Sequence, residues 1–498
     1  MTIKKAAVIG AGVMGAGIAA HLANAGVEVD LLDIVPAGAA DRDTIARAAI
    51  DRMAKTNPAP LMHPKNARRI RPGNTEDHLD RLKECDLIIE AVIENPAIKS
   101  ALYKKIDAAR KPGSIIGSNT STIPLQNLVE GQSETFKKDF VITHFFNPPR
   151  YMRLLELVVS PHNGAETVEK VTRFMDENLG KGVIRCNDTP GFIGNRIGTF
   201  WLQCAINEAH DKKLTVEEAD AIMSRPLGIP KTGVFGLIDL VGLDLMPHIS
   251  KSLIEKLPAS DAYVVDHKKY PVIDKMIADG FTGRKGKGGF YRLDANKQKL
   301  AVDLETGATR PAAKPKIKAV KDAKKKGIRA LIESGDKFGA FAWAVLRKTI
   351  CYAAEHAHTI TGDITGVDEA MKMGYGWAAG PFELLDKIGV AYFIDRLRRE
   401  GVPVPAFLEK AAGRPMYRVE AGVLQFLGAD GAYRAVQRAA GVLLLSDIKR
   451  KSKPLIKNSS ASLWDIGDGV LCFEFHSKMN SLNFFTLRLM NKACDLIE

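Results

Sequence analysis

A glycine-rich turn close to the N-terminus constrains the fold of this 498-residue chain more than any other feature. The apolar run Ala6 to Ile9 leads into Gly10-Ala11-Gly12-Val13-Met14-Gly15, and an Ala-rich helical pattern follows from Ile18 to Ala25. A second apolar run then leads to Asp33. Strand, glycine turn, helix, strand and terminal acid in this order predict a βαβ unit that binds a dinucleotide pyrophosphate at the helix N-terminus.

Asp33 narrows the choice of dinucleotide. A carboxylate at the end of the second strand accepts hydrogen bonds from both ribose hydroxyls of the adenosine, and it repels a 2′-phosphate. No arginine follows Asp33 directly to neutralise such a phosphate. The sequence therefore favours NAD over NADP, and the motif by itself leaves FAD open.

Composition bounds the class of protein. The length indicates about two to four domains, and 46% hydrophobic residues suffice for buried cores. Six cysteines lack metal-like spacing, and the N-terminus runs straight into the first strand. These features predict a cytoplasmic protein with no metal site and no signal peptide. No apolar stretch approaches the ~18 residues of a membrane span, so none is expected.

The net charge of +13 is concentrated in two lysine-rich stretches, Lys314 to Arg329 and Lys449 to Lys457. The first contains no aromatic residue, and both lie between periodic segments. We interpret them as solvated linkers and expect no nucleic-acid partner. A basic surface would also help to attract a substrate that carries phosphates.

Residues 1–187 alternate short apolar runs with helical patterns, which is typical of a Rossmann-type, doubly wound α/β sheet. From Thr189 onward the pattern becomes almost wholly helical. The further strands expected in the sheet cover Leu87 to Val92, Ser114 to Gly117, Phe140 to His144 and Leu154 to Val159.

The helical part contains an internal repeat. Two all-helical modules, residues 188–292 and 338–445, joined by a basic linker at 293–337, account for it. Because such modules bury their apolar faces, we expect a homodimer or a monomer with an internal pseudo-dimer. The matched positions are Glu208 and Glu355, Asp220 and Asp368, Gly233 and Gly380, Asp239 and Asp386, and Gly242 and Gly389.

His144 and Glu156 are candidates for acid–base chemistry. His144 ends a predicted strand, and the C-terminal ends of strands in such a sheet face the ligand crevice. Glu156 lies inside the next apolar run, where a carboxylate is costly without a partner. A neighbouring imidazole would supply that partner and gain basicity. The pair is therefore a hypothesis for a general base with its orienting carboxylate; a satisfied buried histidine beside an edge-strand glutamate is the structural alternative.

Two further segments carry polar groups after strands. The turn Gly117 to Thr122 is dense in hydroxyls and amides, which either bind substrate or nicotinamide or serve as turn and helix caps. Glu90, Glu94 and Lys99 follow the strand at Leu87 to Val92, and they either line the cofactor cleft or pair on the surface.

Five ordered motifs resemble the 3-hydroxyacyl-CoA dehydrogenase family. The resemblance spans roughly residues 3 to 290, and the second helical module resembles the duplicated one of longer members. The motifs are Gly10-Ala11-Gly12-Val13-Met14-Gly15, Glu90-Ala91-Val92-Ile93-Glu94 with Lys99, Ser118-Asn119-Thr120-Ser121, His144-Phe145-Phe146-Asn147-Pro148, and Asp188-Thr189-Pro190-Gly191-Phe192-Ile193-Gly194-Asn195-Arg196.

The resemblance implies an NAD-dependent, reversible oxidation of (S)-3-hydroxyacyl-CoA to 3-oxoacyl-CoA in fatty-acid β-oxidation. It implies that His144 takes the proton of the 3-hydroxyl and that Glu156 orients the imidazole. Ser121, Asn195 and Tyr375 resemble substrate contacts. The positions that resemble cofactor contacts are Gly10, Gly12, Met14, Gly15, Asp33, Glu94, Lys99, Ser121 and Asn147.

The tail, residues 446–498, resembles a linker followed by the start of a crotonase-type enoyl-CoA hydratase domain. Only about the first strand of that domain is present, so hydration by this chain alone is not expected, and a hydratase or thiolase partner is considered. Val470 to Phe475 is expected either to pack as a strand or to stay mobile. Two rival functions are a dehydrogenase of a free 3-hydroxy acid and an inactive scaffold remnant of a bifunctional enzyme.

Overall fold

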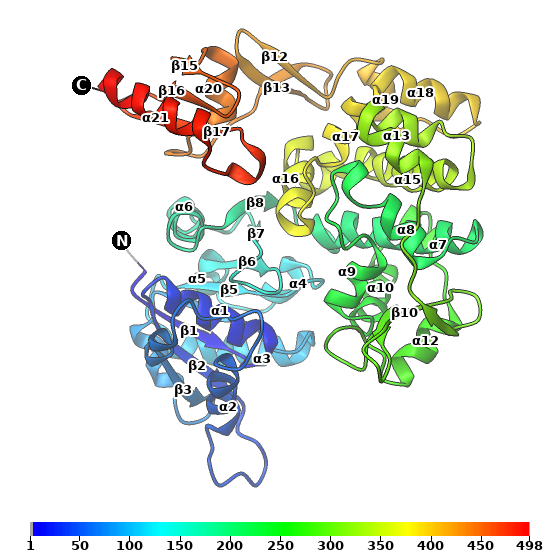
Figure 1. Ribbon diagram of the computed structural model, residues 1–498. Helices are drawn as coiled ribbons and strands as arrows, with labels where there is room; N and C mark the ends of the chain where they lie inside the picture. Colours follow the sequence, from blue (N-terminus) through cyan, green and yellow to red (C-terminus); the bar gives the residue numbers. More distant parts are fainter. Residues whose placement is uncertain (1–2, 498) are drawn as a thin grey trace. The chain divides into compact units, whose positions relative to one another are not determined.

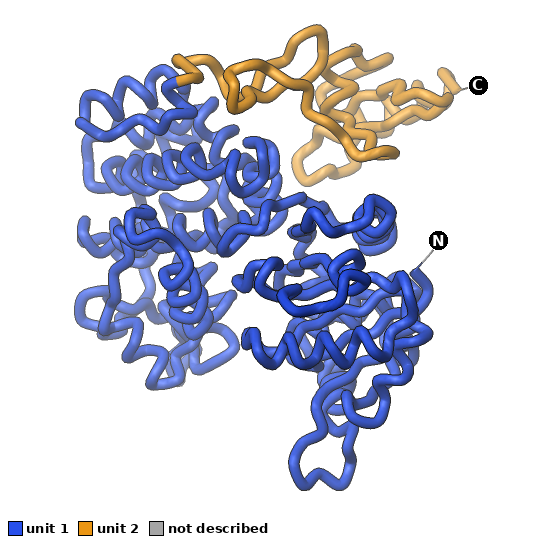
Figure 2. The backbone as a smooth tube through the Cα atoms, turned by 180° about the vertical axis from the view of Figure 1, so that it is seen from behind, with its two compact units in different colours: residues 1–409 blue, residues 410–498 orange. Residues whose placement is uncertain are grey.

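The structure of the protein is a computed structural model that describes residues 3–497. The chain forms two compact units, one up to residue 409 and one from residue 410 onward (Figure 2). Every residue that the sequence assigns to a site belongs to the first unit.

An eight-stranded sheet forms the N-terminal part of the first unit, with strand order β3-β2-β1-β4-β5-β6-β7-β8 (Figure 1). Neighbouring strands are parallel except β6 and β7, which are antiparallel. The order 3-2-1-4-5-6 confirms the Rossmann-type fold, whose ligand crevice lies where the order reverses beside β1. The strands are β1 (Lys5–Ile9), β2 (Glu28–Asp33), β3 (Ile70–Asn74), β4 (Leu87–Glu90), β5 (Ile115–Ser118), β6 (Phe140–Phe145), β7 (Leu154–Val158) and β8 (Gly182–Cys186).

The four strands that the apolar runs predict are confirmed as β4 to β7, with small shifts at their ends. The edge strands β3 and β8 were not predicted. Pro72 and Gly73 lie within β3, and both residues argue against a strand in a sequence although an edge strand tolerates them.

Helices pack on both faces of the sheet. On one face, α1, α2 and α6 cover an apolar layer that includes Leu155 and Leu157 of β7. Because side chains alternate along a strand, Glu156 points to the opposite face. There, Tyr103 of α3 and Phe136 of α5 pack with Phe140 of β6. The helices are α1 (Val13–Asn24), α2 (Thr44–Met53), η1 (Pro64–Arg69), η2 (Leu79–Glu84), α3 (Pro96–Ala109), α4 (Leu125–Val129), α5 (Glu134–Asp139), α6 (Ala165–Arg173) and η3 (Phe174–Asn178).

Two helical modules follow the sheet, and α7 of the first packs against α15 of the second (Figure 1). The modules therefore share a buried face within one unit, as the internal pseudo-dimer alternative requires. The first module contains η4 (Gly194–Gly198), α7 (Thr199–Asp211), α8 (Val216–Ile222), η5 (Arg225–Leu227), α9 (Phe235–Val241), α10 (Leu245–Lys256), α11 (Ala262–Val265) and α12 (Pro271–Ala278), and the second contains α15 (Lys337–Ile360), α16 (Ile364–Tyr375), α17 (Pro381–Ile388), α18 (Val390–Arg399) and α19 (Ala406–Ala411).

The two helical modules of the predicted internal repeat contain equivalent hydrogen bonds. Asp220 in α8 accepts hydrogen bonds from backbone amides at the start of α9, at 2.8 and 2.7 Å. Asp368 in α16 accepts in the same way from amides at the start of α17, at 2.9 and 3.1 Å. Each module thus uses a buried aspartate to hold the N-terminus of its next helix.

Residues 293–337 are not the solvated linker that their lysine content predicts. They contribute to an antiparallel sheet of order β11-β10-β9 and form two helices. Ala319, Ala323 and Ile328 are buried, so the lysines occupy only the exposed side of these helices. A run of lysines interrupted by small apolar residues therefore packs as an amphipathic helix. The elements are β9 (Tyr291–Leu293), β10 (Lys299–Val302), β11 (Thr309–Pro311), α13 (Lys318–Lys326) and α14 (Ile328–Ile332).

The prediction that residues 338–445 are wholly helical is wrong, because the second unit contains three strands within this range. Helix α19 is followed by an antiparallel sheet of order β12-β13-β14. Each helical module is thus followed by a three-stranded antiparallel sheet, and strands this short carry too few alternations for a clear sequence signal. The strands are β12 (Tyr417–Glu420), β13 (Val423–Leu427) and β14 (Tyr433–Ala435).

In the tail of the second unit, the run Val470 to Phe475 packs as a strand, the first of the two predicted alternatives. Strand β17, within the predicted run Val470 to Phe475, pairs antiparallel with β16, which in turn pairs with β15. The basic stretch Lys449 to Lys457 is likewise not a plain linker, because its ends lie in α20 and β15. The elements are α20 (Leu445–Lys451), β15 (Ile456–Lys457), β16 (Ala461–Asp465), β17 (Leu471–Phe475), η6 (Lys478–Asn480) and α21 (Phe484–Ile497).

His21, a buried histidine in α1, predicts that the stability of the fold falls in acid. Burial, together with the nearby ammonium of Lys181, lowers the pKa of His21 from 6.5 to about 4. The ring donates to the Leu179 carbonyl at 3.0 Å, and its Nδ1 has no hydrogen-bond partner among the described residues. Since the unfolded chain binds a proton near pH 6.5 and the folded chain does not, stability falls as the pH drops from 6.5 toward 4.

We expect this histidine to remove roughly 3 kcal/mol from the free energy of unfolding between pH 7 and pH 4. His21→Gln, which keeps an N–H donor for the carbonyl, should flatten that part of the stability curve. Urea unfolding at several pH values measures the effect, and His162→Gln on the surface is the control. Parallel curves for wild type and His21→Gln would contradict the assignment.

Candidate active site

The glycine turn after β1 has the geometry that a bound pyrophosphate needs. Gly10 has φ 105°, and a Cβ on it would lie 2.5 Å from the Ala91 carbonyl oxygen. A Cβ on Gly15 would lie 1.7 Å from the Gly10 oxygen, so this glycine lets α1 pack on the turn. Gly12 faces open space and begins α1 without a side-chain cap. The first amides of α1 are therefore left for an anion, which fits a dinucleotide phosphate. Met14 is partly buried against the apolar layer of the sheet.

Asp33 lies at the end of β2 beside this turn. Its Oδ2 accepts a hydrogen bond from the Ala11 amide at 2.5 Å, and its Oδ1 accepts one from the Ile34 amide at 2.7 Å. The carboxylate therefore joins the end of β2 to the glycine turn, where it can also meet ribose hydroxyls.

Sequence reasoning missed three exposed apolar residues around this edge of the sheet. Val13, Ile34 and Ile93 are 75%, 64% and 65% exposed. Val13 lies within the glycine turn, Ile34 directly follows β2, and Ile93 lies three residues after the end of β4. Apolar side chains in such places suit the faces of a nucleotide base or nicotinamide ring. The available signal was an isoleucine placed immediately after the strand-ending Asp33.

A buried ion pair stands behind the end of β4. The Lys99 ammonium lies 2.6 Å from Glu90 Oε1 and 3.3 Å from Glu94 Oε2. Tyr103 and Ser118 donate to the other oxygen of Glu90, both at 2.7 Å. Lys99 is 1% exposed, so the surface-pair alternative for Lys99 is wrong. It holds two carboxylates at the cofactor edge instead.

Glu94 is bound to the hydroxyl-rich turn after β5. Its Oε1 accepts hydrogen bonds from the Ser121 amide at 2.6 Å and from the Ser121 hydroxyl at 3.1 Å, and Thr120 donates at 3.0 Å. Burial raises the pKa of Glu94, but the Lys99 ammonium and these donors outweigh burial and lower it. Lys256 of α10, which the sequence did not single out, donates to the Thr122 carbonyl of the same turn at 2.8 Å.

His144 and Glu156 form a buried pair. They lie directly opposite each other in the antiparallel register of β6 and β7, and His144 Nδ1 is 2.7 Å from Glu156 Oε2. An ionised carboxylate only accepts hydrogen bonds, so Nδ1 carries the proton and Nε2 keeps its lone pair. The arrangement presents a basic nitrogen near the C-terminal end of β6, with a carboxylate that stabilises its protonated form.

The second oxygen of Glu156 is held by the start of the helical part. Oε1 accepts hydrogen bonds from the backbone amides of Ile193 at 2.9 Å and Gly194 at 2.7 Å. These amides lie at the N-terminal end of the π-helix η4, which favours a negative charge. Phe192, directly before them, has φ 49°, an unusual conformation for a bulky residue. The strained turn thus aims two amides at one carboxylate.

Aromatic rings surround the imidazole. The ring of Phe146 lies 4.7 Å from that of His144, and Phe192 lies 5.7 Å away, measured between centroids. Asn119 Oδ1 accepts a hydrogen bond from the Phe145 amide at 2.9 Å and so ties the β5 turn to the end of β6. Asn147, two residues after Phe145, is exposed at this edge of the sheet.

Asn195 and Tyr375 come from the two helical modules. Asn195 is the second residue of η4 and is 8% exposed. Tyr375 is the last residue of α16, and its hydroxyl donates to the Gly194 carbonyl at 3.0 Å. The structure therefore brings both residues to η4, beside the Glu156 carboxylate.

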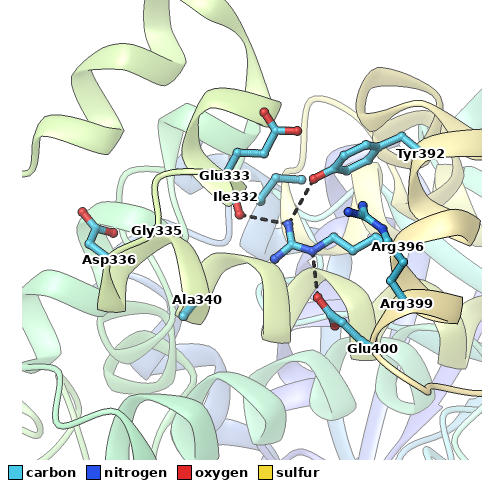
Figure 3. Close-up of a pocket in the computed structure, with 9 residues that line it drawn as sticks. All are labelled: Ile332, Glu333, Gly335, Asp336, Ala340, Tyr392, Arg396, Arg399 and Glu400. Carbon is cyan, nitrogen blue, oxygen red and sulfur yellow. Dashed lines mark hydrogen bonds and ion pairs between the residues drawn. The ribbon is translucent and has the colours of Figure 1, made fainter.

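A cavity of about 500 Å³, lined by the second module and by the end of the segment 293–337, does not belong to this site (Figure 3). Its most prominent polar group, Arg396, is already bound to Glu400, to the Ile332 carbonyl and to the Tyr392 hydroxyl. The other lining residues are Glu333, Gly335, Asp336, Ala340 and Arg399.

Within residues 3–497, no group of three or more His, Cys, Asp or Glu side chains is arranged to hold a metal ion. None of the helices over the same residues has the length and apolar character needed to cross a membrane.

Two consecutive parts of the chain match known family models. Residues 5–189 match the family described as "3-hydroxyacyl-CoA dehydrogenase, NAD binding domain", and residues 191–293 match "3-hydroxyacyl-CoA dehydrogenase, C-terminal domain". A Deinococcus radiodurans protein named "Probable 3-hydroxyacyl-CoA dehydrogenase" is 41% identical over 292 residues, covering 59% of this chain and 83% of that protein.

A Rickettsia felis protein named as a "fatty acid oxidation complex trifunctional enzyme" is 38% identical over 500 residues, covering 100% of this chain and 66% of its own length. The chain spans 65–66% of the length of the relatives that it matches throughout. A solved 3-hydroxybutyryl-CoA dehydrogenase from Escherichia coli has the same fold, with TM-score 0.62, 21% identity, and coverage of 83% of this chain and 98% of its own.

Proposed function

Since the chain belongs to the 3-hydroxyacyl-CoA dehydrogenase family, whose N-terminal domain binds NAD, we propose that it oxidises (S)-3-hydroxyacyl-CoA to 3-oxoacyl-CoA in fatty-acid β-oxidation. The observation that carries the proposal is the buried contact of 2.7 Å between His144 and Glu156. It lies on the same edge of the sheet as the glycine turn and Asp33.

His144 is the general base in this proposal. Its Nε2 accepts the proton of the 3-hydroxyl, and the positive charge that forms on the ring is stabilised by Glu156. Bound NAD supplies the acceptor for the hydride that leaves C3. The Phe146 and Phe192 rings keep water from the imidazole, which strengthens its interaction with the carboxylate.

The substrate contacts are proposed on both sides of the imidazole. The Ser121 hydroxyl, in the turn after β5, and the Asn195 amide, in η4, hold the 3-oxygen and the thioester carbonyl. The proposed cofactor contacts remain Glu94, Lys99 and Asn147. Lys99 contributes indirectly, because its ammonium binds the Glu90 and Glu94 carboxylates.

NADH formation tests the proposal directly. Purified protein, NAD and 3-hydroxybutyryl-CoA at pH 7 to 9 should give a rise in absorbance at the NADH band, and free 3-hydroxybutyrate should give none. Turnover of the free acid would favour the rival dehydrogenase. No turnover with either compound, or with a longer acyl-CoA, would favour the inactive scaffold.

Asp33→Asn is expected to lower kcat/KM for NAD by roughly 10- to 100-fold, the value of hydrogen bonds to a charged acceptor. Loss of the negative charge should also narrow the preference for NAD over NADP. Initial rates with both cofactors measure the change. Asp41→Asn, an exposed carboxylate on the same segment, should leave both values unchanged. An unaltered kcat/KM for NAD in Asp33→Asn would remove this residue from the cofactor site.

The last part of the proposal concerns the C-terminal tail and the partner enzymes. Within the tail, strand β17 and the end of β16 lie in the stretch Leu463 to Asn483 that resembles the start of a hydratase domain, and a hydratase or a thiolase is the proposed partner in successive β-oxidation steps. The six cysteines are free thiols, which accords with the proposed cytoplasmic setting.

A further inference from the structure

The end of α16 packs against β7, which carries Glu156, and against the neighbouring β8 and η4. Three close approaches occur in succession. A Cβ on Gly182 of β8 would lie 1.9 Å from Met373 Sδ, and a Cβ on Gly374 would lie 2.7 Å from Leu154 of β7. A Cβ on Gly198 of η4 would lie 2.0 Å from the ring of Tyr375. The second module therefore packs on β7, β8 and η4 with almost no free space.

The Tyr375 hydroxyl extends this packing to the active site. It donates to the Gly194 carbonyl at 3.0 Å, and the Gly194 amide donates to Glu156 Oε1 at 2.7 Å. Burial, and then the negative charge of Glu156, raise the pKa of Tyr375, so its hydroxyl remains a donor. Glu156 in turn contacts His144.

We propose that Tyr375 is a positioning residue: its hydroxyl fixes the Gly194 carbonyl, which holds the backbone of Gly194, and the Gly194 amide in turn orients Glu156 and His144. The proposal rests on the proposed dehydrogenase function. In it, the second helical module contributes the Tyr375 hydroxyl that positions the active-site residues. It differs from a direct substrate contact, because the hydroxyl is already bound to the chain.

The geometry explains why packing alone would not suffice. Gly194 has no side chain, and Phe146 fills the space where one would stand, at 2.6 Å from a built Cβ. A glycine has a wide choice of backbone conformations. It therefore needs a hydrogen bond from outside to hold one orientation while its amide binds Glu156.

Tyr375→Phe removes the hydroxyl and keeps the ring against Gly198. We expect kcat for 3-hydroxyacyl-CoA oxidation to fall about five-fold, the rate equivalent of one neutral hydrogen bond. The KM values for the thioester and for NAD should not change. Gly198→Ala, which displaces the same ring, should lower kcat by at least as much.

Tyr352→Phe is the matched control. The Tyr352 hydroxyl also joins the two modules, through Arg196 and Asp261, but it does not contact Gly194. This variant should lose thermal stability and keep its kcat. Equal losses of kcat in Tyr352→Phe and Tyr375→Phe would mean general loosening and would overturn the proposal, and so would a raised KM with an unchanged kcat.

A second readout needs neither substrate nor cofactor. In protein labelled with ¹⁵N-histidine, the ring N–H of His144 should shift and exchange faster with water in Tyr375→Phe but not in Tyr352→Phe. An unchanged resonance together with normal kcat would overturn the proposal. If the wild type does not oxidise the thioester, the proposed function fails, and this resonance still decides whether Tyr375 positions the pair.

Discussion

Replacing His144 by asparagine is expected to lower kcat for thioester oxidation by about 10²- to 10⁴-fold, the usual contribution of a general base. The asparagine amide can still donate to Glu156 from near the place of Nδ1, so the carboxylate keeps a partner. What disappears is the lone pair of Nε2, which accepts the proton of the 3-hydroxyl.

The measurement is a single-turnover assay with 3-hydroxybutyryl-CoA, combined with a fluorescence titration of NADH. Cofactor affinity should be unchanged, because His144 lies in β6 and the glycine turn lies after β1. The surface substitution His162→Asn controls for the change of residue type. A variant that kept a tenth or more of the wild-type rate would exclude His144 as the base.

Glu156→Gln is expected to reduce kcat by roughly 10²- to 10³-fold, in the range seen when a preorganised polar partner is lost. Glu156 accepts from His144 on one oxygen and from the Ile193 and Gly194 amides on the other. A glutamine offers one accepting oxygen and one NH₂ group. Its NH₂ must therefore face either two backbone donors or the imidazole.

Each orientation of the glutamine has a cost. An NH₂ facing the amides leaves two donors unsatisfied, which costs about 1–3 kcal/mol of stability for each buried group. An NH₂ facing the imidazole shifts the ring proton to Nε2 and leaves no base. Glu217→Gln is the control, since Glu217 of the first module is also buried and pairs with Arg310 of β11. It should lose stability without loss of kcat, measured by thermal unfolding and initial rates. A fully active Glu156→Gln would contradict the role of the charge.

Much of the cofactor half of the site was predictable from local sequence. The turn Gly10 to Gly15, the helix behind it and Asp33 lie within one βαβ unit, and their roles follow from backbone geometry that neighbouring residues impose. The apolar runs of β4 to β7 were equally clear. The lysine-rich segments were misread, because composition records their charge but not the small residues, such as Ala319 and Ala323, that pack them on a neighbour.

The arrangement of His144 and Glu156 was predictable only in part. Sequence placed both in adjacent strands and suggested a pair, but it left a structural alternative open. The antiparallel register of β6 and β7 set them opposite each other, twelve residues apart along the chain. That register depends on which strands pair and on the geometry of the connection between them, and the two apolar runs alone do not give it.

The glycine turn, the succession of the main strands along the chain and the polar residues at their ends could be read from the sequence, because short-range backbone preferences and apolar periodicity govern these features. How the Glu156 carboxylate is held depends on tertiary packing. Ile193 and Gly194 reach Glu156 through a strained turn, and Tyr375 reaches Gly194 from 181 residues away. Such contacts arise when separate modules pack, and their specificity lies in three-dimensional complementarity that a linear pattern does not contain.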